Sequence, residues 1–129
     1  MKLMVLIVED EATLAKNIKR YLERHGIYAV VVDSGDEALG VVNERHPDVV
    51  LVDSSLHGMD GLTLSQRIRR IDDRAAVVML SGESGTDAAA RLAAAGASAW
   101  HGKPVAMGEL KRTLMRFIRY EEYQVYGQA

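Results

Sequence analysis

Short apolar segments alternate along the chain with longer segments whose apolar residues recur at helical spacing. The first apolar segment, Leu3–Val8, contains no polar residue, which is typical of a strand buried on both faces of a sheet. The following segment places Leu14, Ile18 and Leu22 on one helical face. The expected strands cover residues 3–8, 28–32, 49–52, 76–80 and 97–100. The expected helices cover residues 12–25, 36–45, 62–70 and 86–95, and a last one after Pro104 carries Leu110, Leu114, Phe117 and Ile118 on one stripe.

Helix-ending and helix-starting residues stand where this alternation needs them. Gly26 and Gly96 follow the first and fourth helical segments, where glycine commonly ends a helix. Ser34 and Glu37 have the spacing of a capping box at the start of the second helix. Pro47 disfavours helix at the residue before it, so that helix should end by then.

Five strands alternating with five helices indicate a single α/β domain. Such an alternation favours right-handed crossovers and a parallel sheet with helices on both faces. Ligands of open parallel sheets bind beyond the carboxyl ends of the strands. The residues directly after each strand are therefore the candidates for a functional site.

Composition narrows the classes of protein that this chain can belong to. The chain has 129 residues, of which 48% are hydrophobic and 26% charged, an ordinary globular balance. It has no cysteine, which excludes disulfides, thiolate metal sites and cysteine catalysis. The net charge of −2 lacks the basic excess of a nucleic-acid-binding domain, so we expect this domain to make no direct contact with nucleic acid.

Apolar runs are too short for a membrane segment. The longest are six residues, such as Leu3–Val8, whereas a membrane span needs about 20. The amino-terminal run is also too short for a signal peptide, and acidic residues follow it at once. We therefore expect a soluble cytoplasmic protein that does not bind membranes.

Charged and hydroxyl side chains follow four of the expected strands. Glu9 and Asp10 follow the first, Asp53 the third, Ser81 the fourth, and Lys103 comes shortly after the fifth. Neighbouring carboxylates repel one another and take up protons unless a cation intervenes. Mg²⁺ suits such a group, and together with an ammonium it is complementary to a phosphoryl group. A carboxylate in this setting can also act as a nucleophile and become an acyl phosphate.

Two longer motifs join these residues into a known pattern. The segment Asp-Ser-Ser-Leu-His-Gly-Met-Asp-Gly at 53–61 resembles Asp-x-x-Met-Pro-x-Met-Asp-Gly of the receiver domains of two-component response regulators. The segment Gly-Ala-Ser-Ala-Trp-His-Gly-Lys-Pro at 96–104 resembles the Gly-Ala-x-x-aromatic-x-x-Lys-Pro stretch of the same family. The spacings of Asp10, Asp53 and Lys103 also agree with that family, and the resemblance covers residues 2–120.

The resemblance implies a role for each matching residue around the phosphorylation site. Asp53 is the expected phosphoacceptor. Asp10, Asp53 and the backbone carbonyl of Ser55 are the expected ligands of Mg²⁺, with Mn²⁺ as an alternative, and Glu9 is expected to bind the ion through water. Ser55 and Glu83 flank the approach of the hydrolytic water in the family, so we expect them to set the lifetime of the phosphorylated state.

The other matching residues concern the switch that phosphorylation operates. Ser81 and Lys103 are expected to contact the phosphoryl group, and Trp100 stands at the position of the switch aromatic residue. The peptide bond between Lys103 and Pro104 is expected to be cis, which proline makes accessible. His57 stands where the family usually has proline. We expect a tolerated loop substitution there, with a changed loop shape or a pH-sensitive contact as alternatives.

The same resemblance implies the architecture and the partners. It implies a flavodoxin-like, doubly wound three-layer sandwich with strand order 2-1-3-4-5, a receiver domain at 1–120, and a carboxyl-terminal tail or start of a linker at 121–129. It implies a signalling module rather than an enzyme for a separate substrate. The expected phosphodonor is a histidine kinase or a histidine phosphotransfer protein. The face at 86–120 is expected to contact an output partner or a second copy in a homodimer.

Other readings compete with a stand-alone receiver. The chain is alternatively the receiver portion of a hybrid histidine kinase, or a non-phosphorylated pseudo-receiver acting as an interaction module. A hydrolase of the haloacid-dehalogenase type also uses an aspartyl nucleophile, but it requires a second aspartate where Ser55 stands. A flavodoxin-like nucleotide binder requires phosphate-binding backbone amides after the first strand, where Glu9 and Asp10 stand.

Overall fold

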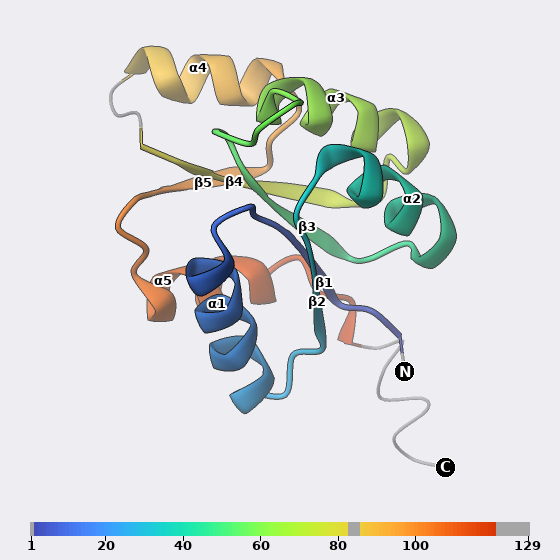
Figure 1. The fold of residues 1–129 in the computed structure, drawn as a ribbon, viewed down its shortest axis with the longest axis vertical. Coiled ribbons are helices and arrows are strands. Elements are labelled where there is room, and N and C mark those ends of the chain that lie inside the picture. Colours follow the sequence, from blue (N-terminus) through green and yellow to red (C-terminus); the bar gives the residue numbers. More distant parts are fainter. Residues whose placement is uncertain (1, 83–85, 121–129) are drawn as a thin grey trace.

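We describe residues 2–82 and 86–120 of the protein, as placed in a computed structural model of the chain (Figure 1). Strands and helices alternate through these residues in the predicted order. The strands are β1 (Val5–Val8), β2 (Ala29–Val32), β3 (Val49–Asp53), β4 (Ala76–Ser81) and β5 (Ala99–Gly102). The helices are α1 (Ala12–Arg24), α2 (Gly35–Arg45), α3 (Gly61–Ile71), α4 (Thr86–Ala94) and α5 (Met107–Met115).

The strands form one parallel sheet in the order β2-β1-β3-β4-β5, which confirms the predicted fold class and strand order. Val5 of β1 lies opposite Ala29 of β2 on one side and opposite Val49 of β3 on the other. Helices α1 and α5 cover one face of the sheet, and α2, α3 and α4 cover the other (Figure 1). The result is a three-layer sandwich in which every strand runs in the same direction.

Neighbouring residues of the central strands enter two separate hydrophobic cores. Leu6 of β1 packs in the same cluster as Leu64 of α3, whereas Ile7 packs in the same cluster as Ile18 of α1. Alternate residues of a strand point to opposite faces of the sheet. A strand with helices on both faces therefore needs apolar residues at every position, which explains the uninterrupted apolar runs. Burying one such side chain contributes about 1.5–3 kcal/mol.

The predicted helix boundaries are confirmed at four places. The Ser34 hydroxyl accepts a hydrogen bond of 3.3 Å from the N–H of Glu37 and caps the start of α2. Helix α2 ends where His46, the residue before the proline, adopts the left-handed conformation. Gly26 and Gly96 have φ angles of 77° and 84° after α1 and α4, and glycine adopts such angles without a steric penalty.

The strand predicted over 97–100 was wrong by two residues, since β5 covers Ala99–Gly102. The N–H of Ala97 still donates to the carbonyl of Leu92, at 3.1 Å, and so belongs to the end of α4. The N–H of Ser98 then donates to the carbonyl of Val77, at 2.7 Å, and brings the chain alongside β4. Regular pairing starts only beyond that bond, a boundary that local apolar character does not reveal.

The last helix is also shorter than its apolar stripe predicted. Helix α5 ends at Met115, so Phe117 and Ile118 lie beyond it. Both residues nevertheless pack against the cluster that contains Leu110 and Leu114. The stripe therefore identified the buried side chains correctly and the length of the helix incorrectly.

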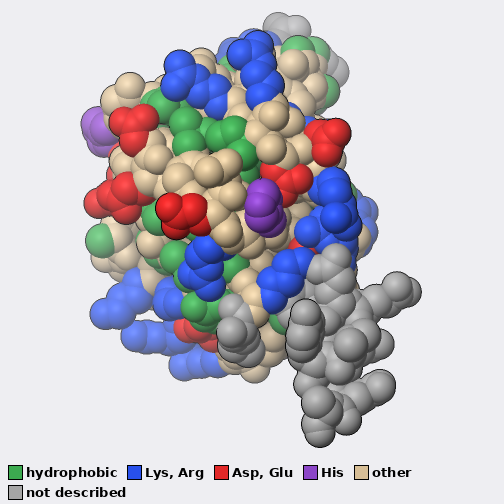
Figure 2. All heavy atoms as spheres, turned by 90° about the vertical axis from the view of Figure 1, so that its right-hand side faces the viewer, with side chains coloured by type: hydrophobic (Ala, Val, Ile, Leu, Met, Phe, Trp, Pro, Cys, Tyr) green, Lys and Arg blue, Asp and Glu red, His purple; other side chains and the backbone are tan. Residues whose placement is uncertain are grey.

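None of the helices in residues 2–82 and 86–120 has the length and hydropathy that crossing a membrane requires. The face seen in Figure 2 carries Lys and Arg side chains interspersed with Asp and Glu, not a continuous basic surface. This mixture agrees with the nearly balanced charge of the chain.

Candidate functional site

The parallel sheet brings the charged residues predicted from the sequence to one edge. Glu9 and Asp10 directly follow β1, Asp53 is the last residue of β3, and Ser81 is the last residue of β4. Lys103 directly follows β5, because that strand ends at Gly102. Since all strands run the same way, these five positions lie at the carboxyl-end edge.

Three carboxylates form the centre of this group. One carboxylate oxygen from each of Glu9, Asp10 and Asp53 lies within 4.8 Å of the others. Glu9 and Asp53 are buried, with 2% and 3% of their surface exposed, whereas Asp10 is partly exposed. Glu11, the next residue, is exposed at the start of α1 and is not part of this group.

Glu9 is the most perturbed acid of the group. Its pKa is raised to about 8, mainly by burial and next by the adjoining carboxyl group of Asp53, while the charge of Lys103 acts in the opposite direction. Neither side-chain oxygen of Glu9 has a hydrogen-bond partner among the described residues. A buried acceptor without a donor is costly, so this carboxyl group requires either a proton or a cation beside it.

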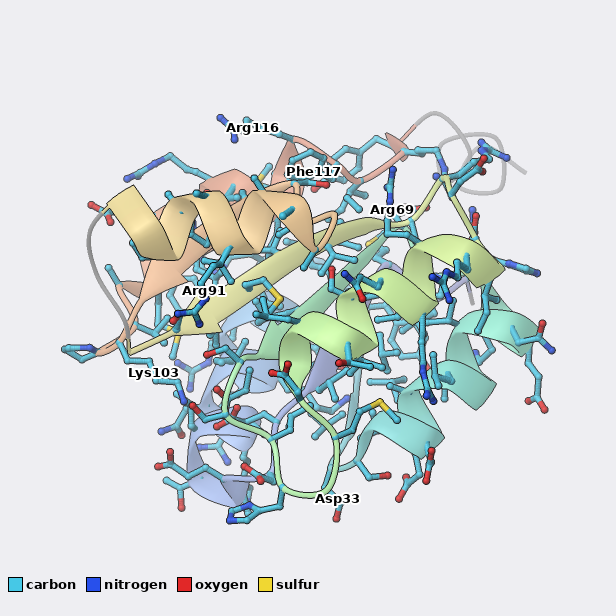
Figure 3. All side chains as sticks on the ribbon, turned by 90° about the horizontal axis from the view of Figure 1, so that it is seen from above. Asp33, Arg69, Arg91, Lys103, Arg116 and Phe117 are labelled. Carbon is cyan, nitrogen blue, oxygen red and sulfur yellow. The ribbon has the colours of Figure 1, made fainter. Side chains whose placement is uncertain are left out.

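Lys103 supplies a fixed positive charge at this edge. Its Nζ lies 3.1 Å from Oδ1 of Asp53 and 3.8 Å from Oε1 of Glu9. Partial burial lowers the pKa of Lys103, but the hydrogen bond to Asp53 and the charge of Glu9 outweigh it and raise the pKa above its ordinary value. The ammonium therefore stays charged at neutral pH. The peptide bond between Lys103 and Pro104 is cis, and the side chain extends toward the loop after β3 (Figure 3).

The loop after β3 is held by close backbone contacts. The N–H of Ser55 donates to Oδ1 of Asp53 at 3.1 Å, and Asp60 caps α3 by accepting from the N–H of Leu62 at 3.3 Å. A Cβ atom on Gly61 would lie only 2.7 Å from the carbonyl oxygen of Asp53. Glycine is therefore required where α3 begins directly against the end of β3.

Asp10 is held by a residue from this same loop. The N–H of His57 donates to Oδ2 of Asp10 at 3.1 Å, and Nδ1 of the His57 ring contacts the same oxygen. The hydrogen bond from the ring is the main cause that lowers the pKa of Asp10 below its ordinary value. Of the alternatives for His57, the structure therefore contains a contact with the acidic group, which the sequence alone did not locate.

A cavity is lined in part by the loop after β3. It has a volume of ≈ 300 Å³, and Ser55, Ser81 and Arg91 are among the residues that line it. Ser81 is buried and Ser55 is exposed. Arg91 of α4 and Lys103 lie on the same side of the molecule (Figure 3). Sequence reasoning did not single out Arg91, because a charged residue on an exposed helix position carries no local indication of a site.

Two further site residues predicted from the sequence are Trp100 and Glu83. Trp100 lies in β5 opposite Met79 of β4, and it is half-buried against the cluster that contains Leu92 of α4. The predicted switch residue is thus between the sheet and the helix of the expected output face. Glu83 lies outside the described residues.

The donor set fits a hard divalent cation. It consists of three carboxylates, one of them buried and without a hydrogen-bond donor among the residues described, beside a single ammonium. Such oxygen-rich groups suit Mg²⁺, which keeps several waters and takes one or two carboxylates. The buried, unpartnered oxygens of Glu9 are the observation that supports the fit.

Comparisons with known proteins agree on one family. The family model of the response regulator receiver domain matches residues 5–115. The DNA-binding response regulator MtrA of Mycolicibacterium paratuberculosis is 36% identical over 86 residues, which is 67% of this chain and 38% of MtrA. The autoinducer 1 sensor kinase/phosphatase LuxN of Vibrio campbellii is 35% identical over 81 residues, which is 63% of this chain and 10% of LuxN. This chain therefore spans only a minor part of each.

A solved structure has the same fold over nearly its whole length. The Francisella response regulator 1452 receiver domain superposes with a TM-score of 0.84 at 27% sequence identity. The superposition covers 88% of this chain and 94% of that one.

Proposed function

The chain belongs to the family of response regulator receiver domains, and from that premise we propose that it accepts a phosphoryl group on Asp53 in a two-component pathway. One observation carries this proposal. The buried carboxylate of Asp53 lies between an ammonium at 3.1 Å and two further carboxylates, at the edge of the sheet where ligands reach the strand ends. This arrangement supports the proposed roles of Asp53 as the nucleophile, Lys103 as the cation beside it and the carboxylates as a metal-binding group.

The two oxygens of Asp53 have different surroundings. Lys103 and the N–H of Ser55 both contact Oδ1. In the proposed reaction Oδ2 attacks phosphorus, the phosphorus–oxygen bond to Asp53 forms, and the bond to the donor's leaving group breaks in line with it. The donor is a phosphohistidine of a kinase or phosphotransfer protein, or a small acyl phosphate. Lys103 holds the acceptor carboxylate in place throughout.

The remaining residues would hold the metal and the phosphoryl oxygens. Asp10, Asp53 and the carbonyl of Ser55 would bind Mg²⁺ or Mn²⁺ directly, and Glu9 would do so through water. The ion, when bound, neutralises negative charge on the transferring group. The hydroxyl of Ser81 would donate to a phosphoryl oxygen, since it lines the cavity beside the acceptor loop.

Release of the phosphoryl group needs a water on the side opposite the Asp53 oxygen. Ser55 lines the cavity of ≈ 300 Å³ beside that loop, which supports a role for its side chain in the approach of this water. We propose that Ser55 and Glu83 set the lifetime of the aspartyl phosphate. Timing the loss of phosphate in Ser55→Ala and Glu83→Ala tests this, and unchanged lifetimes in both would refute it.

The output is proposed to run through the face of α4, β5 and α5. Trp100 and Ser81 lie on neighbouring strands of that half of the sheet, so a movement of Ser81 toward a phosphoryl group would open space for the indole. The face would then meet a partner, an attached output domain or a second copy. Similarity to a sensor kinase favours one second candidate, the receiver portion of a hybrid histidine kinase.

Incubation with Mg²⁺ and acetyl phosphate, followed by intact mass measurement, tests the proposed function. We expect a gain of one phosphate that Asp53→Asn abolishes. Asp33→Asn, a change at an exposed aspartate after β2, should leave the gain intact. No gain in the unaltered chain, together with no Mg²⁺-dependent binding of beryllofluoride, would contradict the proposal.

A further inference from the structure

The imidazole of His57 lies on the solvent side of the acidic group. Its Nδ1 contacts Oδ2 of Asp10, and the backbone N–H of the same residue donates to that oxygen at 3.1 Å. The His57 side chain is 94% exposed, whereas the Asp10 side chain is 21% exposed. The ring is therefore anchored at Asp10 through its backbone and is otherwise free of packing that would prevent it from turning.

A second observation concerns Glu9, whose carboxyl group lacks a hydrogen-bond donor among the described residues. Both oxygens of this carboxyl group are buried. The ammonium of Lys103 lies closer to Asp53 than to Glu9, at 3.1 Å against 3.8 Å. A cation bound by Asp10 would supply the partner that the oxygens of Glu9 lack, and the ring of His57 already contacts Asp10.

From this juxtaposition we infer that His57 is a specificity-determining residue of the metal site, supplying a ring nitrogen as an additional ligand to the ion bound by Asp10. The inference rests on the proposed function, because it concerns the same ion. It adds an imidazole nitrogen, which is a softer donor than a carboxylate oxygen, to a set that is otherwise made of oxygen. The N–H of His57 can keep its hydrogen bond to Asp10 while the ring turns toward the ion.

The consequence is a change in which ions the site prefers. Mg²⁺ favours oxygen ligands and gains little from an imidazole. Ions later in the first-row series, such as Ni²⁺ and Zn²⁺, gain much more from imidazole nitrogen. We therefore expect His57→Gln to weaken Ni²⁺ binding by about tenfold or more, and to leave Mg²⁺ binding within about threefold, because the oxygen ligands are unchanged.

The test uses the full chain with Mn²⁺ as a paramagnetic probe. Electron spin echo envelope modulation of the bound Mn²⁺ should reveal coupling to a ¹⁴N nucleus in the unaltered protein and none in His57→Gln. His25→Gln, a change at an exposed histidine at the end of α1, is the matched control and should retain the coupling. Calorimetric titrations with Ni²⁺ and with Mg²⁺ then give the two affinities for each variant.

Three results would overturn the inference. Mn²⁺ is not bound at all, it is bound without ¹⁴N coupling, or His57→Gln tightens the binding of every ion, which would mean that the ring competes with the ion for Asp10. The second and third leave the proposed function standing, since Mg²⁺-dependent phosphorylation of Asp53 is measured separately by mass. Failure of that phosphorylation, in contrast, contradicts the proposed function.

Discussion

Lys103 and Asp53 form the ion pair around which the acidic group is arranged, with Nζ of the lysine 3.1 Å from Oδ1 of the aspartate. The two residues come from the ends of different strands, and the sheet brings them together. The ammonium is 3.8 Å from Glu9 as well, so one cation serves two buried carboxylates. Lys103 therefore contributes to the balance of charge around both of these carboxylates.

Replacing this cation should destabilise the protein in the absence of metal. In Lys103→Met the buried carboxylate of Asp53 loses its ion-pair partner, so we expect the free energy of unfolding to fall by about 1–2 kcal/mol, less than for a fully buried pair because Lys103 is partly exposed. Urea unfolding at neutral pH in EDTA measures this. Lys16→Met, at an exposed position of α1, is the control, and equal midpoints for the two variants would contradict the expectation.

Stability should also depend on pH through Glu9. Its pKa is about 8 in the folded protein, against an ordinary value of 4.5. Between these values the folded state binds more protons at Glu9 than the unfolded chain, so the contribution of Glu9 to stability is complete below pH 4.5 and is lost as the pH rises through 8. Urea unfolding in EDTA across this range should show the fall in the unaltered protein and a smaller fall in Glu9→Gln. Identical slopes would show that Glu9 is not the group responsible.

Two glycine-to-alanine changes should have opposite effects on the stability of the folded protein. At Gly61 an added Cβ would lie 2.7 Å from the carbonyl oxygen of Asp53 and from Cα of Ser54, and backbone atoms cannot yield easily. We expect Gly61→Ala to cost about 1–3 kcal/mol and to displace the acceptor loop. At Gly40 of α2 nothing lies within 4 Å, so Gly40→Ala should stabilise the helix by up to about 1 kcal/mol. Thermal unfolding distinguishes the two variants. Unchanged stability in Gly61→Ala would contradict the close approach of α3 to the end of β3.

The chain just beyond the family match should contribute to the fold. Asp48 is completely buried, and it accepts from the N–H of Arg119 at 3.1 Å while the guanidinium lies 2.8 Å away. Arg119→Ala should cost about 1–3 kcal/mol, since a buried carboxylate loses the cation at 2.8 Å, while Lys2 remains at 3.6 Å. Arg112→Ala, at an exposed position of α5, should stay within about 0.5 kcal/mol. Similar unfolding midpoints would argue that the domain ends before residue 119.

The single tryptophan offers a direct readout of the proposed switch. Trp100 is half-buried between β5 and α4, so an inward movement should shift its fluorescence emission to shorter wavelength. We expect this shift when beryllofluoride and Mg²⁺ are added, and no shift in Asp53→Asn. Beryllofluoride binding without any change in emission would remove Trp100 from the switch while leaving Asp53 as the acceptor.

Most of the fold follows from local pattern. Apolar runs such as Leu3–Val8 identified the central strands, and the cap at Ser34 and the glycines at 26 and 96 identified helix ends, because these signals depend on neighbours in the chain. The start of β5 and the end of α5 were misplaced for the opposite reason. Hydrogen bonds to residues on other elements, such as that from Ser98 to Val77, decide where pairing starts.

The sequence by itself determined which residues meet at the strand ends, because parallel strands share one direction and so carry Glu9, Asp53 and Lys103 to the same edge. Only the tertiary structure decided what each of them contacts. The contact between His57 and Asp10 joins residues 47 positions apart, and that between Arg119 and Asp48 joins residues 71 apart. Neither pair has a local pattern, since the path of a loop and the packing of a chain end place the partners. Topology thus assembled the acidic group, and packing set its charges and hydrogen bonds.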